Sequence, residues 1–512
     1  EAAMLTAYDL VNPANSKSTA MLAHTVVVLD PCLNPDGTDR YANWYNSIVG
    51  AAYNPLRFAR EHDEAWPGGR YNHYYFDLNR DWAWQTQVES QQRVALYNRW
   101  LPHVHVDFHE QGINDPYYFP PAAEPLHEVI TPWQRSFQGD IGKFNAQYFD
   151  KKGWLYFTGE RFDLFYPSYG DTYPIYSGAI GMTFEQAGNG SAGLGVITEN
   201  RDTLTLVDRV MHHHASGLNV LEIVAQQQPK VVEEFKNYYT NAHSGKLSSF
   251  AAYVLKFTNA DQGKLRALQE LLVKNNIQYY TGKGQVKGIA YSSQEEASYT
   301  LQPNDLVIPG NQAKAALIRV LFEPEAKLAD SLTYDITAWA LPYVYGLDGI
   351  ASKVAVRDLQ AYPTDSVKNN IVTSYGYAYK WDSFAAAQLT AALLKAEVPV
   401  KYAEEGFTLA GEDFPAGSIT VLQKGLPPKV DVDALRTMAD RFHVKLYAVT
   451  SGGVEKGNDL GSSKVHRIHA PRVLMFSGEG TRAMNVGEVW HYFDQQLGYP
   501  ISLANLSSYG QV

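Results

Sequence analysis

The chain has 512 residues and a formal net charge of −11, with 45% hydrophobic and 19% charged residues. One core rarely organises a chain of this length, so we expect about three domains. The acidic balance and the lack of a marked run of Lys or Arg argue against nucleic acid as the main partner. No apolar run reaches the roughly 18 residues that would predict a membrane span.

Cys32 is the only cysteine, which excludes an internal disulfide and a zinc site built from several thiolates. We expect this residue to be small and buried rather than a nucleophile. Apolar residues at positions 4, 5, 8 and 11 predict an amphipathic helix over residues 1–11. Because the chain opens inside this helix, we expect residues upstream of it, including any signal peptide. We favour a secreted or periplasmic location.

Residues 1–228 alternate predicted helices and strands, which indicates an α/β domain with a mainly parallel, mixed sheet flanked by helices. Apolar runs predict strands at Thr25–Asp30 and Ile180–Glu185, and alternation of apolar with polar residues predicts a strand at Val104–Phe108. Further helices are predicted over residues 85–100 and 204–224. Asn34-Pro35-Asp36-Gly37 predicts a turn, followed by a polar and aromatic loop. Polar motifs follow the strands, and the carboxyl ends of strands are where such sheets bind ligands.

The remaining sequence predicts smaller α+β domains of unknown role over residues 229–362 and 363–465. Gln226–Lys230 and Ser451–Ser463 are predicted linkers. Residues 466–512 contain a strand and Gly turn over Arg472–Gly480 and then a helix over 486–497, the opening of a Rossmann-like unit. This segment resembles the start of a class I glutamine-amidotransferase-like domain. It stops before such a domain could supply a nucleophile, so we expect no activity from it.

His109 ends the predicted strand Val104–Phe108, two residues after Asp107. A strand holds an imidazole ring in place and a nearby carboxylate can set its tautomer, so this pair suits a metal ligand. The alternative is an ordinary histidine at the start of a loop.

Four motifs in the first half of the chain form an ordered set. They are Asn34–Gly37 with Arg40, Arg70 with Asp77–Arg80, Asp107–His109, and Tyr166–Glu185. In this order they resemble the zinc carboxypeptidase family, the carboxypeptidase A-like M14 metallopeptidases, over about residues 1–225. The resemblance implies a zinc-dependent hydrolase with a peptide substrate.

The resemblance also implies a zinc site, in which His109 matches the later histidine ligand. The family's His-x-x-Glu pair is absent from this sequence, and we expect it just upstream of residue 1. Glu1 would be its glutamate only if the first helix began directly after it. The sequence thus supplies one clear zinc ligand where a catalytic site needs three and an open position, and we expect the chain alone to lack activity for this reason.

Glu185 matches the family's general base, which would take a proton from zinc-activated water and deliver it to the leaving amine. Its alternative role is a salt bridge to an arginine at the sheet edge. Asn79 and Arg80 match the pair that grips a substrate's terminal carboxylate, for which a guanidinium fork is well shaped. The alternative for Arg80 is a structural ion pair with Asp77 or Asp81.

No arginine has the usual spacing for the family's oxyanion-stabilising residue, and Arg70 is the first candidate, ahead of Arg40. Tyr166 best matches the mobile tyrosine that covers the substrate. Three neighbouring tyrosines compete for this role: Tyr169, Tyr173 and Tyr176. Asp171 lies in the segment that shapes the family's side-chain pocket, where a carboxylate would favour a basic C-terminal residue unless it is buried and hydrogen-bonded.

Two further features are not assigned to the site. His212, His213 and His214 are adjacent in a predicted helix, so their rings should point in different directions. Glu110 should point to the opposite side of its strand from His109.

These inferences predict a metallocarboxypeptidase that hydrolyses C-terminal residues of peptides with zinc-activated water and Glu185 as base. One alternative is a non-catalytic protein that binds peptide termini on the same fold. Another is a cell-wall peptide hydrolase or amidase. The abundance of Tyr, Phe and Trp suits a peptide-binding or sugar-binding surface. The sequence gives no indication of the oligomeric state.

Overall fold

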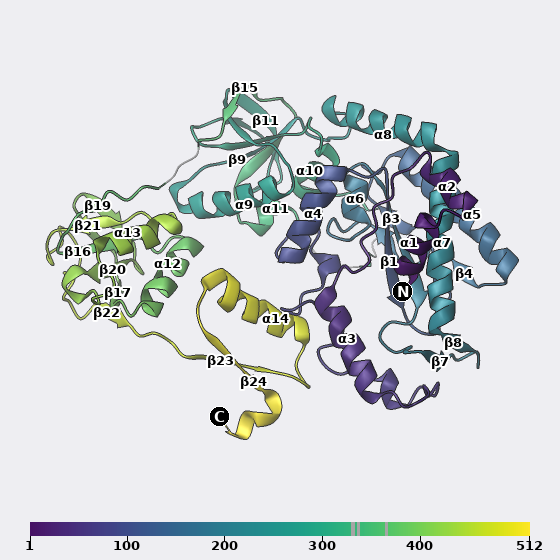
Figure 1. The fold of residues 1–512 in the computed structure, drawn as a ribbon. Coiled ribbons are helices and arrows are strands. Elements are labelled where there is room, and N and C mark those ends of the chain that lie inside the picture. The colour runs from purple at the N-terminus through teal and green to yellow at the C-terminus, as the bar shows by residue number, and fades with distance from the viewer. Residues whose placement is uncertain (329–332, 335–337, 364–366, 512) are drawn as a thin grey trace. The chain divides into compact units, whose positions relative to one another are not determined.

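The computed structural model describes residues 1–328, 333–334, 338–363 and 367–511 (Figure 1). These residues form two compact units, one of residues 1–256 with 268–361 and the other of residues 257–267 with 362–512. Both units combine helices with sheets, so the predicted mixed α/β class is confirmed. The finer division into four domains stays a prediction.

The first sheet lies within residues 104–187 and has the strand order β1-β6-β2-β4. Its strands are β1 (Val104–Gln111), β2 (Tyr117–Tyr118), β4 (Tyr156–Phe157) and β6 (Ile180–Ala187). Strands β1 and β6 are parallel, with Val104 opposite Ile180 and His109 opposite Glu185. Strand β2 pairs antiparallel with β6 and parallel with β4. The parallel register aligns the carboxyl ends of the two longest strands, and polar residues there become neighbours.

Helices α5 (Pro132–Lys152) and α7 (Leu206–Gln226) contact this sheet and bury an aromatic and aliphatic core against it. Phe137, Phe149 and Phe184 are fully buried in this core. Each helix begins with a capping box, from Thr131 and from Thr205, which satisfies backbone N–H groups at the helix start. Truncating one of the three phenylalanines to alanine would cost about 3–5 kcal/mol of stability.

The predicted strand at Thr25–Asp30 does not form, because this segment pairs with no described strand and has no regular secondary structure. Val26, Val28 and Leu29 expose 79%, 55% and 41% of their surface. A run of β-branched residues favours an extended backbone, but a strand also requires a hydrogen-bonding neighbour.

Two other local predictions were wrong. Asn34–Gly37 starts helix α3 (Pro35–Ile48), where the Asn34 side chain accepts a hydrogen bond from Gly37 N and proline occupies the first turn. Asn and Pro favour turns, but they are also the residue types preferred at the N-cap and at the first position of a helix. The predicted linker Gln226–Lys230 lies almost wholly in helices, since α8 (Gln228–His243) starts two residues after α7 ends.

Other elements of residues 1–256 are shorter or lie at the surface. The helices are α1 (Ala2–Val11), α2 (Ser16–Leu22), α4 (Val88–Trp100) and α6 (Thr172–Tyr176), with 3-10 turns at Arg60–His62 and Leu78–Arg80. The paired strands are β3 (Ala123–Leu126) with β5 (Asp163–Leu164), and β7 (Gly195–Ile197) with β8 (Thr203–Thr205).

The first unit also contains an antiparallel sheet of order β12-β11-β14-β9-β13-β10-β15. Its strands are β9 (Ala252–Leu255), β10 (Tyr280–Lys283), β11 (Gln285–Ala290), β12 (Glu296–Thr300), β13 (Leu306–Pro309), β14 (Gly349–Ser352) and β15 (Arg357–Ala361). The helices of this region are α10 (Ala315–Phe322) and α11 (Leu341–Val344), while α9 (Gln262–Lys274) has residues in both units. Helix α10 is buried along nearly its whole length.

The second unit is built on the antiparallel sheet β21-β16-β20-β17-β22. Its strands are β16 (Gly376–Tyr379), β17 (Val400–Ala403), β20 (Ile419–Leu422), β21 (Tyr447–Val449) and β22 (Val465–Ile468). Helices α12 (Phe384–Lys395) and α13 (Val432–Arg441) pack on its core, and β18 (Phe407–Leu409) forms a hairpin with β19 (Glu412–Phe414).

The last described segment has the predicted strand, helix and strand order. Strand β23 (Val473–Ser477) pairs parallel with β24 (Ile501–Asn505), and helix α14 (Ala483–His491) with a π-helical turn (Tyr492–Leu497) connects them. None of the described helices combines the length and apolar character needed to cross a bilayer.

Candidate active site

A cavity of about 470 Å³ opens at the carboxyl ends of β1 and β6. We call it the carboxyl-end cavity. The residues from the sequence motifs that line it include Arg70, Asn79, Arg80, His109 and Glu185. They come from three separate segments of the sequence and meet because the parallel register brings the ends of both strands together.

His109 is held by Asp107, which is two residues earlier in β1 and therefore on the same side of the strand. His109 Nε2 donates a hydrogen bond to Asp107 Oδ2 at 2.7 Å, which leaves Nδ1 for another partner. Burial by itself lowers the pKa of His109, but the Asp107 carboxylate outweighs burial and raises that pKa to about 9. The pair is therefore an imidazole of fixed orientation, braced by a buried carboxylate.

Glu185 lies opposite His109 in the parallel ladder and exposes 8% of its surface. Its Oε2 atom is buried and has no hydrogen-bond partner among the described residues. Burial raises the pKa of Glu185 to about 7, against the opposing charges of His109 and Arg70. A carboxyl group with a pKa near neutrality can both accept and return a proton at physiological pH.

Arg70 and Arg40 have different positions and contacts. Arg70 lines the carboxyl-end cavity and donates from Nε and Nη2 to Asp77 Oδ2, at 3.1 and 2.9 Å. Arg40 instead donates to the backbone carbonyls of Gly68, Tyr71 and Asn72. It therefore supports the loop that contains Arg70, while Arg70 is the guanidinium that faces the cavity.

Asn79 and Arg80 lie on the 3-10 turn Leu78–Arg80, which Asp77 caps by accepting a hydrogen bond from Asn79 N. Asn79 Oδ1 accepts from Gly170 N at 2.8 Å. The Arg80 guanidinium lies 4.5 Å from the centre of the Tyr169 ring and 3.7 Å from Asp77 Oδ2. Arg80 is thus positioned by an aromatic face and a loose ion pair.

Asp81, the other acidic candidate for pairing with Arg80, is committed to its own turn. It is 3% exposed and accepts hydrogen bonds from Thr86 N, Thr86 Oγ1 and Gln87 N.

Gly170 explains why the tyrosine-rich loop can approach β1 closely. A Cβ atom at this position would lie 2.0 Å from Asp107 Oδ2 and 3.1 Å from Trp82 Nε1. The loop is therefore packed directly on the carboxylate that orients His109, and a side chain at this position would displace it.

Tyr166 is buried and is not among the residues that line the cavity. Its hydroxyl accepts a hydrogen bond from Trp84 Nε1 at 2.7 Å. Tyr173 and Tyr176 are fully buried, whereas Tyr169 lines the cavity. The loop thus presents Tyr169 to the cavity rather than the tyrosine selected from the motif.

Asp171 also lines the cavity and is 5% exposed. Burial raises its pKa to about 6, and its Oδ1 has no hydrogen-bond partner among the described residues. A buried acidic group of this kind can accept a donor from a bound molecule.

The lining residues that sequence reasoning did not find include Asp115, Arg161 and Tyr334. Asp115 and Arg161 form an ion pair of 2.9 Å at the cavity. Tyr334 comes from the region after residue 228, in which the sequence shows no motif, so no local signal could have identified it.

The three adjacent histidines of α7 have separate partners, as expected from helical geometry. His212 bonds to Gln186 and His214 to Thr6 and Asp9, while His213 donates to the backbone carbonyl of His109. Glu110 pairs with Arg209 at 2.7 Å and also borders the cavity.

Cys32 is exposed, which corrects the expectation that it is buried. It follows the surface segment at residues 25–30 that was expected to form a core strand.

The described residues do not fit a complete zinc site. Zinc in a catalytic site takes three protein ligands, and among the described residues no group of three or more His, Cys, Asp or Glu side chains is placed to hold a metal ion. His109 is one suitable ligand once its Nδ1 has lost its proton, since a metal-binding imidazole is neutral.

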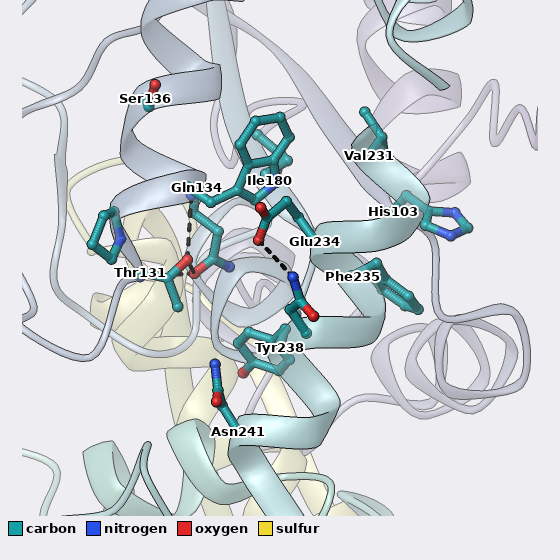
Figure 2. A pocket seen from close by; sticks show the side chains of 14 residues that line it. His103, Thr131, Gln134, Ser136, Ile180, Val231, Glu234, Phe235, Tyr238 and Asn241 are labelled. Carbon is teal, nitrogen blue, oxygen red and sulfur yellow. Dashed lines mark hydrogen bonds between the residues drawn. The ribbon is translucent and has the colours of Figure 1, made fainter. Parts of the chain in front are cut away.

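A second cavity, of about 460 Å³, lies at the amino ends of the same strands and is bordered by His103 and Ile180 (Figure 2). We call it the amino-end cavity. Its polar groups are used within the protein. Gln134 bonds to Thr131, Ile175 and Ala179, and Glu234 bonds to Asn237 and pairs with Lys230. No lining side chain of this cavity has a buried polar atom without a partner.

Fold and site together define an α/β protein with a charged cavity suited to acid–base hydrolysis at the carboxyl ends of parallel strands. Comparison with known protein families shows which family the sequence is similar to. Residues 1–100 match the sequence model of the zinc carboxypeptidase family, which confirms the resemblance that the motifs gave. The matched segment contains Arg70, Asn79 and Arg80, while His109 and Glu185 lie beyond it. Neither a curated protein nor a solved structure matched the chain.

Proposed function

We propose that this protein is a carboxypeptidase-type peptide hydrolase that removes the C-terminal residue of peptides and uses zinc. The observation that carries the proposal is the convergence of His109, Glu185 and the Asn79–Arg80 pair on one cavity. The match to the zinc carboxypeptidase family over residues 1–100 supports the same reaction class.

The protein groups suit distinct tasks in hydrolysis of a peptide bond. The Glu185 carboxylate would take a proton from the attacking water as the new C–O bond forms, and return it to the amine as the C–N bond breaks. Arg70, which faces the cavity near Glu185, would stabilise the negative charge that develops on the carbonyl oxygen. Zinc enters the proposal through the family and His109. Because the described residues supply one clear ligand, no step is assigned to the metal.

Recognition of the free carboxyl terminus would fall to Arg80 and Asn79. Arg80 provides planar donors that match a carboxylate, and the Tyr169 ring beneath it holds the guanidinium in place. Asn79 Oδ1 is occupied by Gly170 N, so its amide N–H groups would be the ones that face the substrate.

Substitution of Glu185 tests the proposal, with Glu234 of the amino-end cavity as the matched control. Hydrolysis of short peptides with free carboxyl termini should fall by about 10²- to 10⁴-fold in Glu185→Gln full-length protein. Glu234→Gln should stay within about twofold of wild type, since it lies outside the carboxyl-end cavity. Undiminished hydrolysis by a folded Glu185→Gln variant would overturn the assignment.

A non-catalytic peptide-binding protein is the second candidate, and the incomplete set of metal ligands in the described residues favours it. In that case wild-type and Glu185→Gln proteins would bind peptides with free carboxyl termini, and neither would hydrolyse them in the presence of zinc.

A further inference from the structure

Three aromatic rings form one wall of the carboxyl-end cavity: Phe162, Tyr169 and Tyr334. The ring centres of Tyr334 and Phe162 are 5.7 Å apart, and those of Tyr334 and Tyr169 are 6.4 Å apart. Phe162 and Tyr169 belong to the region before residue 228, while Tyr334 belongs to the region of the antiparallel sheet β9–β15. The wall is therefore assembled from two parts of the first unit.

Contacts on both sides of Tyr334 attach its region to the cavity. Tyr334 N donates to the buried carboxylate of Asp163 at 2.7 Å. Earlier in the chain, Glu323 accepts a hydrogen bond of 2.6 Å from His127, and both side chains are buried. Arg319 of α10 also pairs with Glu128.

Trp339, on the other side of Tyr334, packs on Phe165 and Tyr166 with ring centres 5.2 and 5.7 Å apart. Its indole N–H donates to the Val320 carbonyl at 3.0 Å. Phe165 and Tyr166 belong to the same loop as Tyr169. This loop and the Tyr334 region are therefore packed together near the cavity.

Tyr334 and Arg80, the residue proposed to bind the substrate carboxylate, both line the cavity, and both lie close to Tyr169. The Tyr169 ring centre lies 6.4 Å from that of Tyr334 and 4.5 Å from the Arg80 guanidinium. If Arg80 binds the carboxylate of a peptide, the side chain of the last residue would therefore lie near the aromatic wall. Residues farther from the terminus would lie away from this wall. Tyr334 exposes 53% of its surface, so much of the ring is available for contact.

We propose that Tyr334 is a specificity-determining residue that contacts the side chain of the C-terminal residue and favours large side chains over small ones. The proposal rests on the proposed function, since it uses the bound orientation given by Arg80. An aromatic ring that packs against a large side chain removes apolar surface from water and gains ring contacts that an alanine side chain cannot make.

The test compares two peptides that differ only in their last residue, Phe or Ala, with full-length protein. Tyr334→Ala should lower the Phe-to-Ala ratio of kcat/KM about tenfold, because one aromatic contact is lost. Tyr334→Phe should keep the ratio within about twofold, since the ring remains. Tyr343→Ala is the matched control: Tyr343 is an exposed tyrosine of the same region that packs on Tyr291 and does not line the cavity.

Binding measured by calorimetry separates failure of this proposal from failure of the proposed function. In the Glu185→Gln background, Tyr334→Ala should weaken binding of the peptide ending in Phe about tenfold and leave the peptide ending in Ala unchanged. If wild type hydrolyses neither peptide, the proposed function fails and these binding data still decide the role of Tyr334. An unchanged Phe-to-Ala ratio in folded Tyr334→Ala, in hydrolysis or in binding, overturns the proposal.

Discussion

The two cavities at opposite ends of β1 and β6 have nearly the same volume, about 470 and 460 Å³, but differ in the state of their polar groups. Three side chains of the carboxyl-end cavity have a buried oxygen without a hydrogen-bond partner among the described residues: Gln111, Asp171 and Glu185. The amino-end cavity has none. Because an unpaired buried polar group costs stability, its presence in a cavity indicates selection for something other than folding.

Local structure explains the difference. The amino ends of the strands are covered by α8 and by the start of α5, whose cap residues Thr131 and Gln134 satisfy each other. The carboxyl ends of β1 and β6 lead into loops that begin at Gly112 and Gly188, and the loops that contain Arg161 and Tyr169 line the same cavity. Loops without a repeating hydrogen-bond ladder leave side chains free to face a ligand.

Among the substitutions that test this difference between the cavities, Asp171→Asn should change stability the most. Burial raises its pKa from the ordinary 3.8 to about 6, so the folded protein favours the protonated form. The stability from this preference is fully present below pH 3.8 and is lost as pH rises through 6. Asp171→Asn cannot ionise, and above pH 6 it should exceed wild type in unfolding free energy by about 3 kcal/mol.

Chemical denaturation of metal-free protein at pH 4 and pH 8 measures this difference. Glu234→Gln, in the amino-end cavity, should gain no stability over wild type at pH 8, because the neighbouring Lys230 lowers the pKa of Glu234 rather than raising it. A pH-independent difference between Asp171→Asn and wild type would contradict the burial argument.

Arg80→Ala should weaken recognition of the substrate terminus. Loss of a charge-assisted contact of about 1.5–3 kcal/mol corresponds to a rise in KM of about 10- to 100-fold for peptides with a free carboxylate. Steady-state kinetics of Arg80→Ala and of the exposed control Arg201→Ala would measure it. Equal KM values in the two variants would remove Arg80 from the carboxylate site.

Alanine substitutions at Gly170 and Gly139 should give the smallest changes in stability, and the two changes should have opposite signs. Gly170→Ala would place a Cβ atom against Asp107 and should cost at least about 1 kcal/mol and reduce activity, because the carboxylate that orients His109 is displaced. Gly139 lies in α5, and a Cβ atom added there would meet nothing within 4 Å, so Gly139→Ala should stabilise the protein by about 0.5–1 kcal/mol. Thermal unfolding and hydrolysis assays of both variants test the contrast.

Strand β6 could be predicted from the sequence because its apolar run is buried and paired, and β1 because apolar and polar residues alternate along it. The run Thr25–Asp30 is also apolar but forms no strand. Residue types indicate a preference for extended backbone, but they do not show whether a neighbouring strand is present to form the hydrogen bonds. The turn predicted at Asn34-Pro35 was wrong because an Asn-Pro pair can begin either a turn or a helix.

The site could be predicted as far as its residues lie on regular elements or fixed motifs. His109, Glu185, Asn79 and Arg80 were identified from strand ends and motif order, and the structure brings them to one cavity. Choosing Tyr169 over Tyr166 requires the loop conformation, which depends on contacts such as Trp84 with Tyr166. Tyr334 reaches the cavity through tertiary contacts alone, from a region without a motif.

The most direct test of the central claim is hydrolysis of one peptide in two forms, with a free and with an amidated C-terminus, by zinc-loaded full-length protein. We expect mass spectrometry to detect stepwise loss of single C-terminal residues from the free form. The amidated form should react at least about tenfold more slowly, since Arg80 has no carboxylate to bind. Equal rates for both forms, or cleavage at internal bonds, would contradict the account.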